Sequence, residues 1–197
     1  MKILYTKKQK QYRKYIEKHR YYVSYAFNRF INHTFLYDQL PNVDLFNLEQ
    51  RIRVHDMSKF DKEEFYPYCQ YFYPEEDHFP SKNIMLQGWI HHYSYNDHHP
   101  EFWIIDRDIY AQHICNENFT GLKSKDMPIE AILEMFSDWL AMSLINHSSL
   151  RDWYNKEGIK LPFSYKTQQL VKQIMNILYQ KSNLDILLTT LQVPDKN

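Results

Sequence analysis

The chain has 197 residues, a length that fits one domain and allows a sizeable buried core. Its 24 basic residues balance 24 acidic ones, so no excess charge indicates a dedicated nucleic-acid-binding protein or a membrane-surface protein. Only three glycines are present, all isolated, which excludes a Walker loop and a dinucleotide-binding fingerprint and disfavours strand-rich folds.

Residues 7–37 contain neither proline nor glycine, and their apolar side chains recur at helical spacing. This pattern predicts one long helix. His19 and His33 are separated by almost a whole number of turns, so both would point from the same side of it, and either is suited to face a site.

A proline-containing break follows, and Asp44 is a suitable N-cap for a second helix. Continued helical geometry would carry His55, Asp56 and Lys59 inward or toward a cleft. His55 and Lys59 would then lie one turn apart on the same face.

The next segments alternate between a short helix and loops. Asp61 can cap a helix over residues 65–72, and residues 74–80 read as an acidic loop bounded by prolines. Ser81 starts the segment that leads into four closely spaced histidines, at positions 91, 92, 98 and 99.

Pro100 biases His99 away from helical geometry, so His98 and His99 should lie in a turn. The remaining helices are expected over residues 101–114, 129–145, 149–157, 164–180 and 184–191. Together these segments predict an all-α chain. We expect a single domain over residues 1–197, with a core at about 15–145 and C-terminal helices over 149–192 packed on it.

The dipeptide His55-Asp56 offers a divalent metal two adjacent ligands, and the histidine cluster supplies further imidazoles. Imidazole and carboxylate together suit manganese, iron, cobalt, zinc or magnesium, so we expect one or two such ions. Asp138 interrupts an apolar stretch, where a carboxylate is costly unless it is paired, hydrogen-bonded or bound to metal. The alternative for Asp138 is an exposed position on the polar face of its helix.

Other polar residues near the expected site have two interpretations each. Lys59 is either a solvated surface residue or a point charge that neutralises a phosphate near the metal. Asn96 either closes a turn or holds substrate, and Glu101 is either a first-turn acid or a proton shuttle. Residues 71–73 and 93–95 are aromatic-rich, which is more typical of a core than of a base-binding pocket.

Four motifs, taken in order, resemble the HD-domain superfamily of metal-dependent phosphohydrolases. They are His19 to Val23 (HRYYV), His55 to Phe60 (HDMSKF), Trp89 to Trp103 (WIHHYSYNDHHPEFW) and Ser137 to Ala141 (SDWLA). They are also similar to an uncharacterised family of phage and bacterial HD-like proteins that carries HDxSKF and WxHHxxxNxHHPEFW motifs. The resemblance covers about residues 15–145, and its histidine-rich motif is long and specific.

The resemblance implies an HD-domain-like helical bundle that holds its metals on named side chains. One metal would be bound by His19, His55, Asp56 and Asp138. A second would be bound by His92 together with one of its neighbours in the cluster, for which the candidates are His99, His98 and His91. In the two-metal HD enzymes such histidines usually come from separate helices, whereas here they are compressed into one short segment.

The function implied is a phosphohydrolase that acts on a nucleotide or another small phosphoester through a metal-activated water. Asp56 would bridge the metals or orient the water, Lys59 would clamp the phosphate, and Glu101 would transfer a proton. Lys59 and Asn96 are the candidate substrate-binding residues. Two alternatives remain open: an HD-type di-iron oxygenase, and a non-catalytic protein that binds or sequesters a nucleotide.

The cysteine content and the hydropathy of the chain bear on its compartment. Cys69 and Cys115 are too few for a disulfide framework and lack the paired spacing of a zinc ribbon. No apolar run is long enough for a signal peptide or a membrane span. We therefore expect a cytoplasmic protein, in the host cytoplasm if it is phage-encoded, with no membrane partner.

Overall fold

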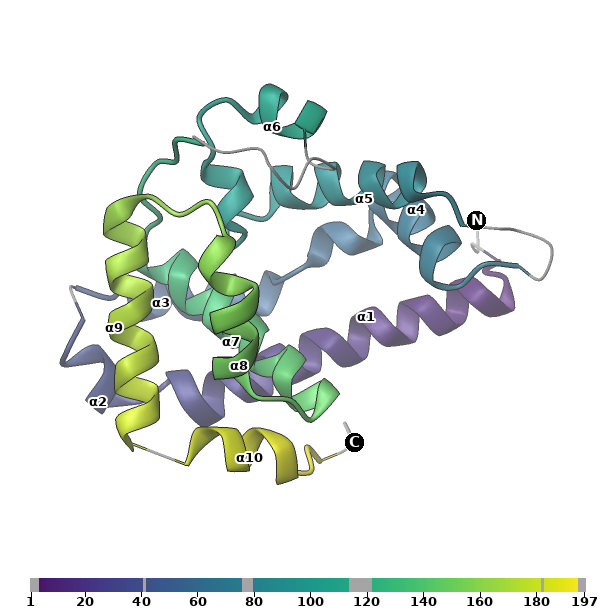
Figure 1. Ribbon diagram of the computed structural model, residues 1–197. Coiled ribbons are helices and arrows are strands. Elements are labelled where there is room, and N and C mark those ends of the chain that lie inside the picture. The colour runs from purple at the N-terminus through teal and green to yellow at the C-terminus, as the bar shows by residue number, and fades with distance from the viewer. Residues whose placement is uncertain (1–3, 41, 76–79, 114–121, 182, 195–197) are drawn as a thin grey trace.

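The computed structural model describes residues 4–40, 42–75, 80–113, 122–181 and 183–194, and these residues form an all-α fold (Figure 1). The helices, in chain order, are α1 (Lys7–Ala26), η1 (Phe27–Ile31), α2 (Thr34–Tyr37), α3 (Leu45–Val54), η2 (Met57–Phe60), α4 (Lys62–Phe72), α5 (Lys82–Tyr95), η3 (Pro100–Trp103), α6 (Arg107–His113), α7 (Ile129–Asn146), α8 (Leu150–Lys156), η4 (Gly158–Lys160), α9 (Tyr165–Lys181) and α10 (Leu184–Thr190). No strand occurs in the described residues, where the only β-type pairing is an isolated bridge between Ile104 and Ser124.

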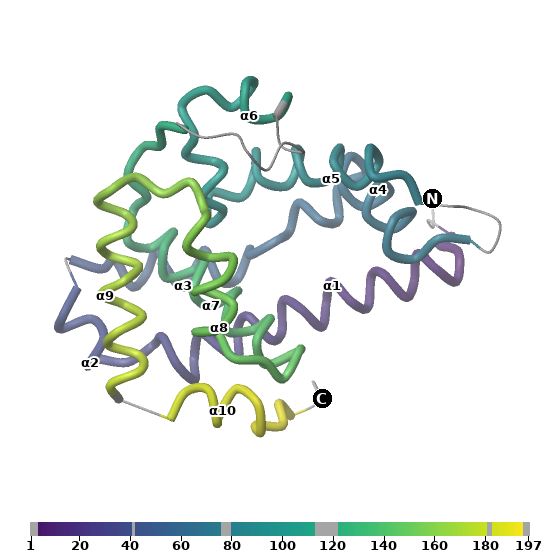
Figure 2. The backbone as a smooth tube through the Cα atoms, viewed as in Figure 1, coloured from purple at the N-terminus to yellow at the C-terminus, as the bar shows by residue number. Residues whose placement is uncertain are grey.

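The main core lies where α1, η1 and α3 pack against α7, with α8, α9 and α10 closing one end of the molecule (Figures 1 and 2). Along α7 nearly every side chain between Ala131 and Leu144 is buried, which explains the broad apolar face of that segment. A second, smaller apolar cluster joins α1 to α4 through Tyr12, Ile16 and Phe65. Helix α4 therefore packs on the N-terminal half of α1 and, on another side, against α5 (Figure 1).

The first helix is shorter than predicted over residues 7–37. It begins with a capping box between Thr6 and Gln9 and stays α-helical to Ala26, after which the chain widens into the π-helical turn η1. Burial of Phe27, Phe30 and Ile31 in the core accompanies this wider turn, so tertiary packing overrides the helical pattern. As a result His33 follows a break in the helix, is half-buried and contacts the Arg29 carbonyl instead of sharing a face with His19.

The second helix also ends earlier than predicted. Asp44 caps α3 as expected, by accepting a hydrogen bond from the Asn47 amide, but α3 stops at Val54. The Arg20 guanidinium donates hydrogen bonds to the carbonyls of Arg53 and His55, at 2.6 and 2.7 Å. These bonds satisfy carbonyl groups that would accept from later amides if the helix continued. His55, Asp56 and Lys59 therefore do not share one helical face.

The third difference lies after the histidine cluster. The predicted helix over residues 101–114 is replaced by the short turn η3 and then by α6, because backbone bonds tie Ile105 to Lys123 and Lys125 to Trp103. Residue 114 lies outside the described residues. Ser81, where this segment was predicted to start, caps α5, and His98 and His99 lie in a turn as predicted.

Two features bear on the expected compartment. Cys69 is a buried free thiol, whereas Cys115 falls outside the described residues. No helix among the described residues is long and apolar enough to cross a membrane.

Candidate metal centre

Seven histidine and aspartate side chains from separate segments converge at the middle of the fold. Helix α1 supplies His19, the end of α3 supplies His55 and Asp56, and α7 supplies Asp138. The last turn of α5 and the turn after it supply His92, His98 and His99. Because these segments pack around one point, the predicted ligands meet although His19 and Asp138 lie 119 positions apart in the chain.

Asp56 lies at the centre of this convergence. Its backbone adopts a left-handed conformation with φ of 55°, which turns the chain sharply after α3 and directs the carboxylate inward, where the residue is only 1% exposed. Oxygen Oδ2 lies 3.2 Å from His19 Nε2 and 3.4 Å from His55 Nε2. Oxygen Oδ1 lies 3.5 Å from His92 Nε2 and 3.7 Å from His98 Nε2. One carboxylate thus faces two sets of imidazoles.

Among the described residues, potential ligand atoms form three groups, each with its atoms within 4.8 Å of one another. One of these joins Glu134 to His55 and His98, and the other two lie next to the carboxylate of Asp56. The first donor group comprises His19, His55 and Asp138, and it is completed by Asp56 Oδ2, which lies close to both histidines. The second donor group comprises Asp56, His92, His98 and His99. Both groups are buried sets of atoms that could hold a metal ion, which agrees with the chemistry predicted from the sequence.

The spacing of these atoms fits ligands around a common ion. Ligands about 2.0–2.2 Å from an ion in tetrahedral or octahedral geometry are roughly 3–3.5 Å apart. His19 Nε2 lies 3.2 Å from Asp138 Oδ1, and the His92 and His99 Nε2 atoms lie 2.8 Å apart.

Several of the converging atoms also lack a hydrogen bond. Among the described residues, these unpartnered buried atoms include His19 Nε2, His55 Nε2, His98 Nε2, Asp56 Oδ1 and Asp138 Oδ1. Buried polar atoms are rarely left without a partner, so their convergence favours an ion between them.

The charge states of the carboxylates suit metal binding. Burial alone would raise the pKa of Asp56, but His55 and Lys59 hold it well below its usual value. Burial also opposes ionisation of Asp138, and contacts with His19 and His55 nevertheless keep the pKa of that carboxyl well below normal. Both aspartates are therefore anionic, as ligands must be.

The histidines differ between the two groups. Burial holds the pKa of His92 and of His99 well below the usual value, so both imidazoles are neutral near pH 7. For His19, burial lowers the pKa, but the nearby carboxylates of Asp138 and Asp56 outweigh it and raise the pKa overall. A cation in the first donor group therefore competes with a proton that His19 binds more tightly than usual.

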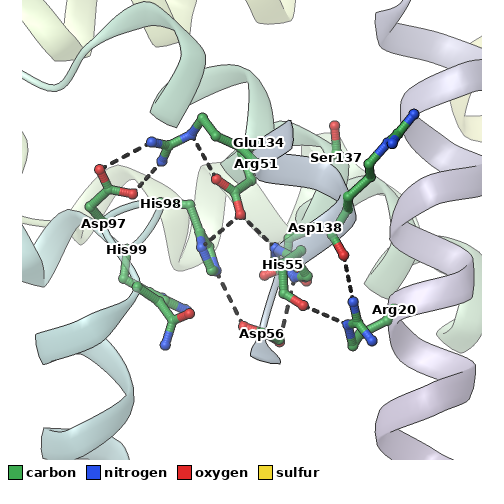
Figure 3. A network of polar contacts seen from close by, with 12 residues as sticks. Arg20, Arg51, His55, Asp56, Asp97, His98, His99, Glu134, Ser137 and Asp138 are labelled. Atoms are coloured by element: carbon green, nitrogen blue, oxygen red, sulfur yellow. Dashed lines mark hydrogen bonds and ion pairs between the residues drawn. The ribbon is translucent and has the colours of Figure 1, made fainter. Parts of the chain in front are cut away.

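A buried glutamate contacts one histidine of each donor group, at the ring nitrogens that do not face Asp56 (Figure 3). Glu134 Oε1, on α7, lies 2.9 Å from His55 Nδ1 and 3.3 Å from His98 Nδ1, and Glu134 Oε2 lies 2.9 Å from Arg51 Nε. The same arginine pairs with Asp97. Contacts with His98 and His55 outweigh burial and hold the pKa of Glu134 well below its usual value.

Another buried glutamate supports the second donor group. Glu64, on α4, has one oxygen 2.6 Å from His92 Nδ1 and the other 3.1 Å from His91 Nδ1. His91 stacks on Tyr95 with ring centroids 4.4 Å apart and belongs to neither donor group. The geometry therefore favours His92, His98 and His99 over His91 as ligands.

A cavity of about 880 Å³ opens beside the two donor groups. His19, His92, His99 and Asp138 reach its wall, and Lys59 joins them with its Nζ 2.6 Å from Asp56 Oδ2. The rest of the wall is largely aromatic, with the side chains of Tyr12, Tyr15, Tyr68, Tyr71, Phe72, Tyr73 and Trp89. Lys82 adds a second positive charge. The cavity is large enough for a small organic ligand.

Two further predicted residues lie away from this cavity. Asn96 caps α5, and its amide donates to Ser58 Oγ and the His92 carbonyl, both at 2.7 Å, so it ties η2 to α5. Glu101 is buried on η3 and lines a separate cavity of about 320 Å³ together with His99 and Asp138. Burial raises the pKa of Glu101 to about 7.

Sequence reasoning did not select Glu134, Glu64, Arg51 or Arg20, all of which contact the site. Acidic and basic residues on amphipathic helices usually face solvent, and their contacts here come from segments far away in the chain. One signal was present for Glu134: it lies one turn before Asp138 on α7, so the two acids share a face of a largely buried helix.

The chain was compared with protein families, curated proteins and solved structures. The model of a family of unknown function, DUF5662, matches residues 8–181, a range that includes both donor groups. No curated protein and no solved structure matches the chain.

Proposed function

The chain belongs to the DUF5662 family, and we propose that it is a metal-dependent phosphohydrolase acting on a nucleotide or another small phosphoester. The observation that carries the proposal is the position of Asp56. Its two oxygens face two buried donor groups, beside a lysine and a cavity of about 880 Å³. The HD-domain resemblance of the sequence motifs supports the same reaction class.

In this proposal His19, His55 and Asp138 would hold one divalent ion, His92, His98 and His99 would hold a second, and Asp56 would be available to both. Such ions would supply Lewis acidity for a phosphoryl group and would make a water more acidic. The chain itself excludes bulk water, because His19, His55, Asp56, His92 and His98 are at most 2% exposed.

Lys59 is the proposed phosphate clamp. Burial would lower the pKa of its ammonium, but Asp56 and Asp138 raise that pKa above its usual value, so Lys59 stays charged. Its Nζ reaches the cavity wall next to Asp138, where it can neutralise a phosphate oxygen. Glu101 does not line this cavity, so its carboxyl, which has a pKa of about 7, would exchange a proton with the site only through the neighbouring cavity that it shares with His99 and Asp138.

The cavity wall favours a substrate with a flat group next to its phosphate. Aromatic rings can stack on a base or another planar ring, and they do so with little preference for its hydrogen-bonding edge. Asn96 is not part of this proposal, because its amide is engaged with Ser58 and it does not line the cavity.

The test is a substrate screen with metal-loaded protein. Nucleoside monophosphates, p-nitrophenyl phosphate and glycerol phosphate are each supplied with manganese, cobalt, magnesium or zinc, and phosphate release is measured. We expect turnover that is lost in Asp56→Asn and is highest for esters with an aromatic ring. No turnover of any ester by metal-loaded protein would contradict the proposal.

One observation favours a second candidate, a di-iron oxygenase. Five of the seven converging side chains are imidazoles, which suit iron as well as zinc. Mössbauer spectroscopy of protein expressed with ⁵⁷Fe and purified without oxygen separates the two functions. A stoichiometric di-iron centre that reacts with oxygen, in protein that releases no phosphate, would favour the oxygenase.

A further inference from the structure

We propose that Glu134 and Glu64 are positioning residues that act on different donor groups. Glu134 orients one histidine in each donor group, whereas Glu64 orients a histidine in the second donor group only. This inference rests on the proposed metal-binding role of both groups. It predicts that the two metal positions are coupled through one buried carboxylate that contacts neither ion.

The contacts of Glu134 show how this coupling would work. A single oxygen, Oε1, lies 2.9 Å from Nδ1 of His55 in the first donor group and 3.3 Å from Nδ1 of His98 in the second. An ionised carboxylate can only accept hydrogen bonds, so each contact requires a proton on Nδ1. In a neutral imidazole the lone pair then sits on Nε2, the atom that faces Asp56 in both histidines.

Glu134 is itself held in place from the other side (Figure 3). Arg51 Nε lies 2.9 Å from Glu134 Oε2, and the Arg51 guanidinium also pairs with Asp97, the residue before His98. Trp103 adds a bond from its indole N–H to the Asp97 carbonyl at 2.7 Å. The turn that carries His98 is therefore fixed to the same glutamate that orients His55.

Glu64 makes a different set of contacts. One of its oxygens lies 2.6 Å from Nδ1 of His92 and the other lies 3.1 Å from Nδ1 of His91. His91 belongs to neither donor group. Glu64 is fully buried, and burial raises its pKa to about 6. Its direct influence on metal ligands is thus confined to His92 in the second donor group.

The experiment compares two glutamine variants with matched controls. The control for Glu134→Gln is Glu130→Gln, one turn away on α7. Among the described contacts, the Glu130 carboxylate accepts a hydrogen bond only from the Asp44 amide. Glu64→Gln is paired with Glu63→Gln, an exposed neighbour that pairs with Lys62. Each protein is stripped of metal and titrated with Co²⁺, and calorimetry and visible absorption report the number of sites and their affinities.

We expect Glu134→Gln to weaken both sites, on the order of 10–100-fold each, and Glu64→Gln to weaken one site by a similar factor. Both controls should bind like wild type. Suppose that wild type binds Co²⁺ at two sites. If Glu134→Gln then binds with unchanged affinity, or loses affinity at one site only, the inference is overturned while the proposed function stands. Absence of Co²⁺ binding by the wild type would overturn both.

A second measurement separates orientation from a merely structural role. Nitrogen-15 NMR of the metal-free protein reports the tautomer of each histidine, and we expect His55 and His98 to carry the proton on Nδ1. Glu134→Asp, which keeps the charge but retracts it, should shift both signals and weaken both sites by less than Glu134→Gln does. Unchanged tautomers in a variant that is simply less resistant to urea would overturn the positioning role.

Discussion

Lys59 Nζ lies 2.6 Å from Asp56 Oδ2, the oxygen that also faces His19 and His55. The ammonium therefore occupies a place beside the first donor group and competes with an ion there for the same carboxylate oxygen. A charged lysine in this position has two effects: it weakens the first metal position and it provides a cation for a substrate phosphate.

Replacing Lys59 with glutamine should separate these effects. With the competing cation removed, the first site should bind Co²⁺ at least as tightly as in wild type. Phosphoester hydrolysis should fall on the order of 100-fold in kcat/KM, since a charge that stabilises the transferring phosphoryl group is lost. Titration and steady-state kinetics on the same preparation check both expectations, and unchanged kcat/KM would remove Lys59 from the mechanism.

Glu101→Gln should stabilise the metal-free protein in a pH-dependent way. The folded-state pKa of Glu101 is raised to about 7 from a usual value near 4.5, so the folded state binds the proton more tightly than the unfolded state. The penalty for ionising the buried carboxyl is absent below pH 4.5, grows between pH 4.5 and pH 7, and levels off above that at about 3 kcal/mol.

Urea unfolding of wild type and Glu101→Gln at pH 5 and pH 8 measures this penalty. The variant should gain more stability at pH 8 than at pH 5. An equal gain at the two pH values, or a larger one at pH 5, would show that the carboxyl of Glu101 is not held above its usual pKa in the fold.

Arg20→Gln should destabilise the end of α3. The guanidinium of Arg20 donates to the carbonyls of Arg53 and His55, and hydrogen bonds from a charged group contribute about 1.5–3 kcal/mol. We expect a loss in that range by urea unfolding and weaker binding at the first metal position, because His55 loses its backbone anchor. Lys14→Gln, at an exposed position on the same helix, should change stability by less than about 0.5 kcal/mol.

Local signals in the sequence predicted much of the fold. The all-α class followed from helical periodicity and scarce glycine. The N-cap Asp44 was correct because a side chain that bonds to an amide three residues later depends only on its neighbours. The errors lie where tertiary contacts decide. The π-helical turn at residues 27–31 follows from core packing, and the end of α3 at Val54 follows from Arg20 on a different helix.

The candidate site divides in the same way. Residue chemistry was sufficient to select His55, Asp56 and Asp138, which the structure brings together. The left-handed backbone of Asp56, which lets one carboxylate face both donor groups, has no sequence signal, since His-Asp dipeptides also occur inside helices. The supporting glutamate Glu134 was also missed, because its partners come from remote segments.

If Asp56 holds two divalent ions between the donor groups, removing its charge should deplete both positions, and the metal content of the purified protein is the direct test. Wild type, Asp56→Asn and the exposed control Asp61→Asn are reconstituted with Mn²⁺ and freed of excess ion, and bound metal is measured by mass spectrometry. We predict two ions per chain in wild type and in Asp61→Asn, and a substoichiometric amount in Asp56→Asn. Equal metal content in wild type and Asp56→Asn, or none in wild type, would show that Asp56 does not hold a pair of ions.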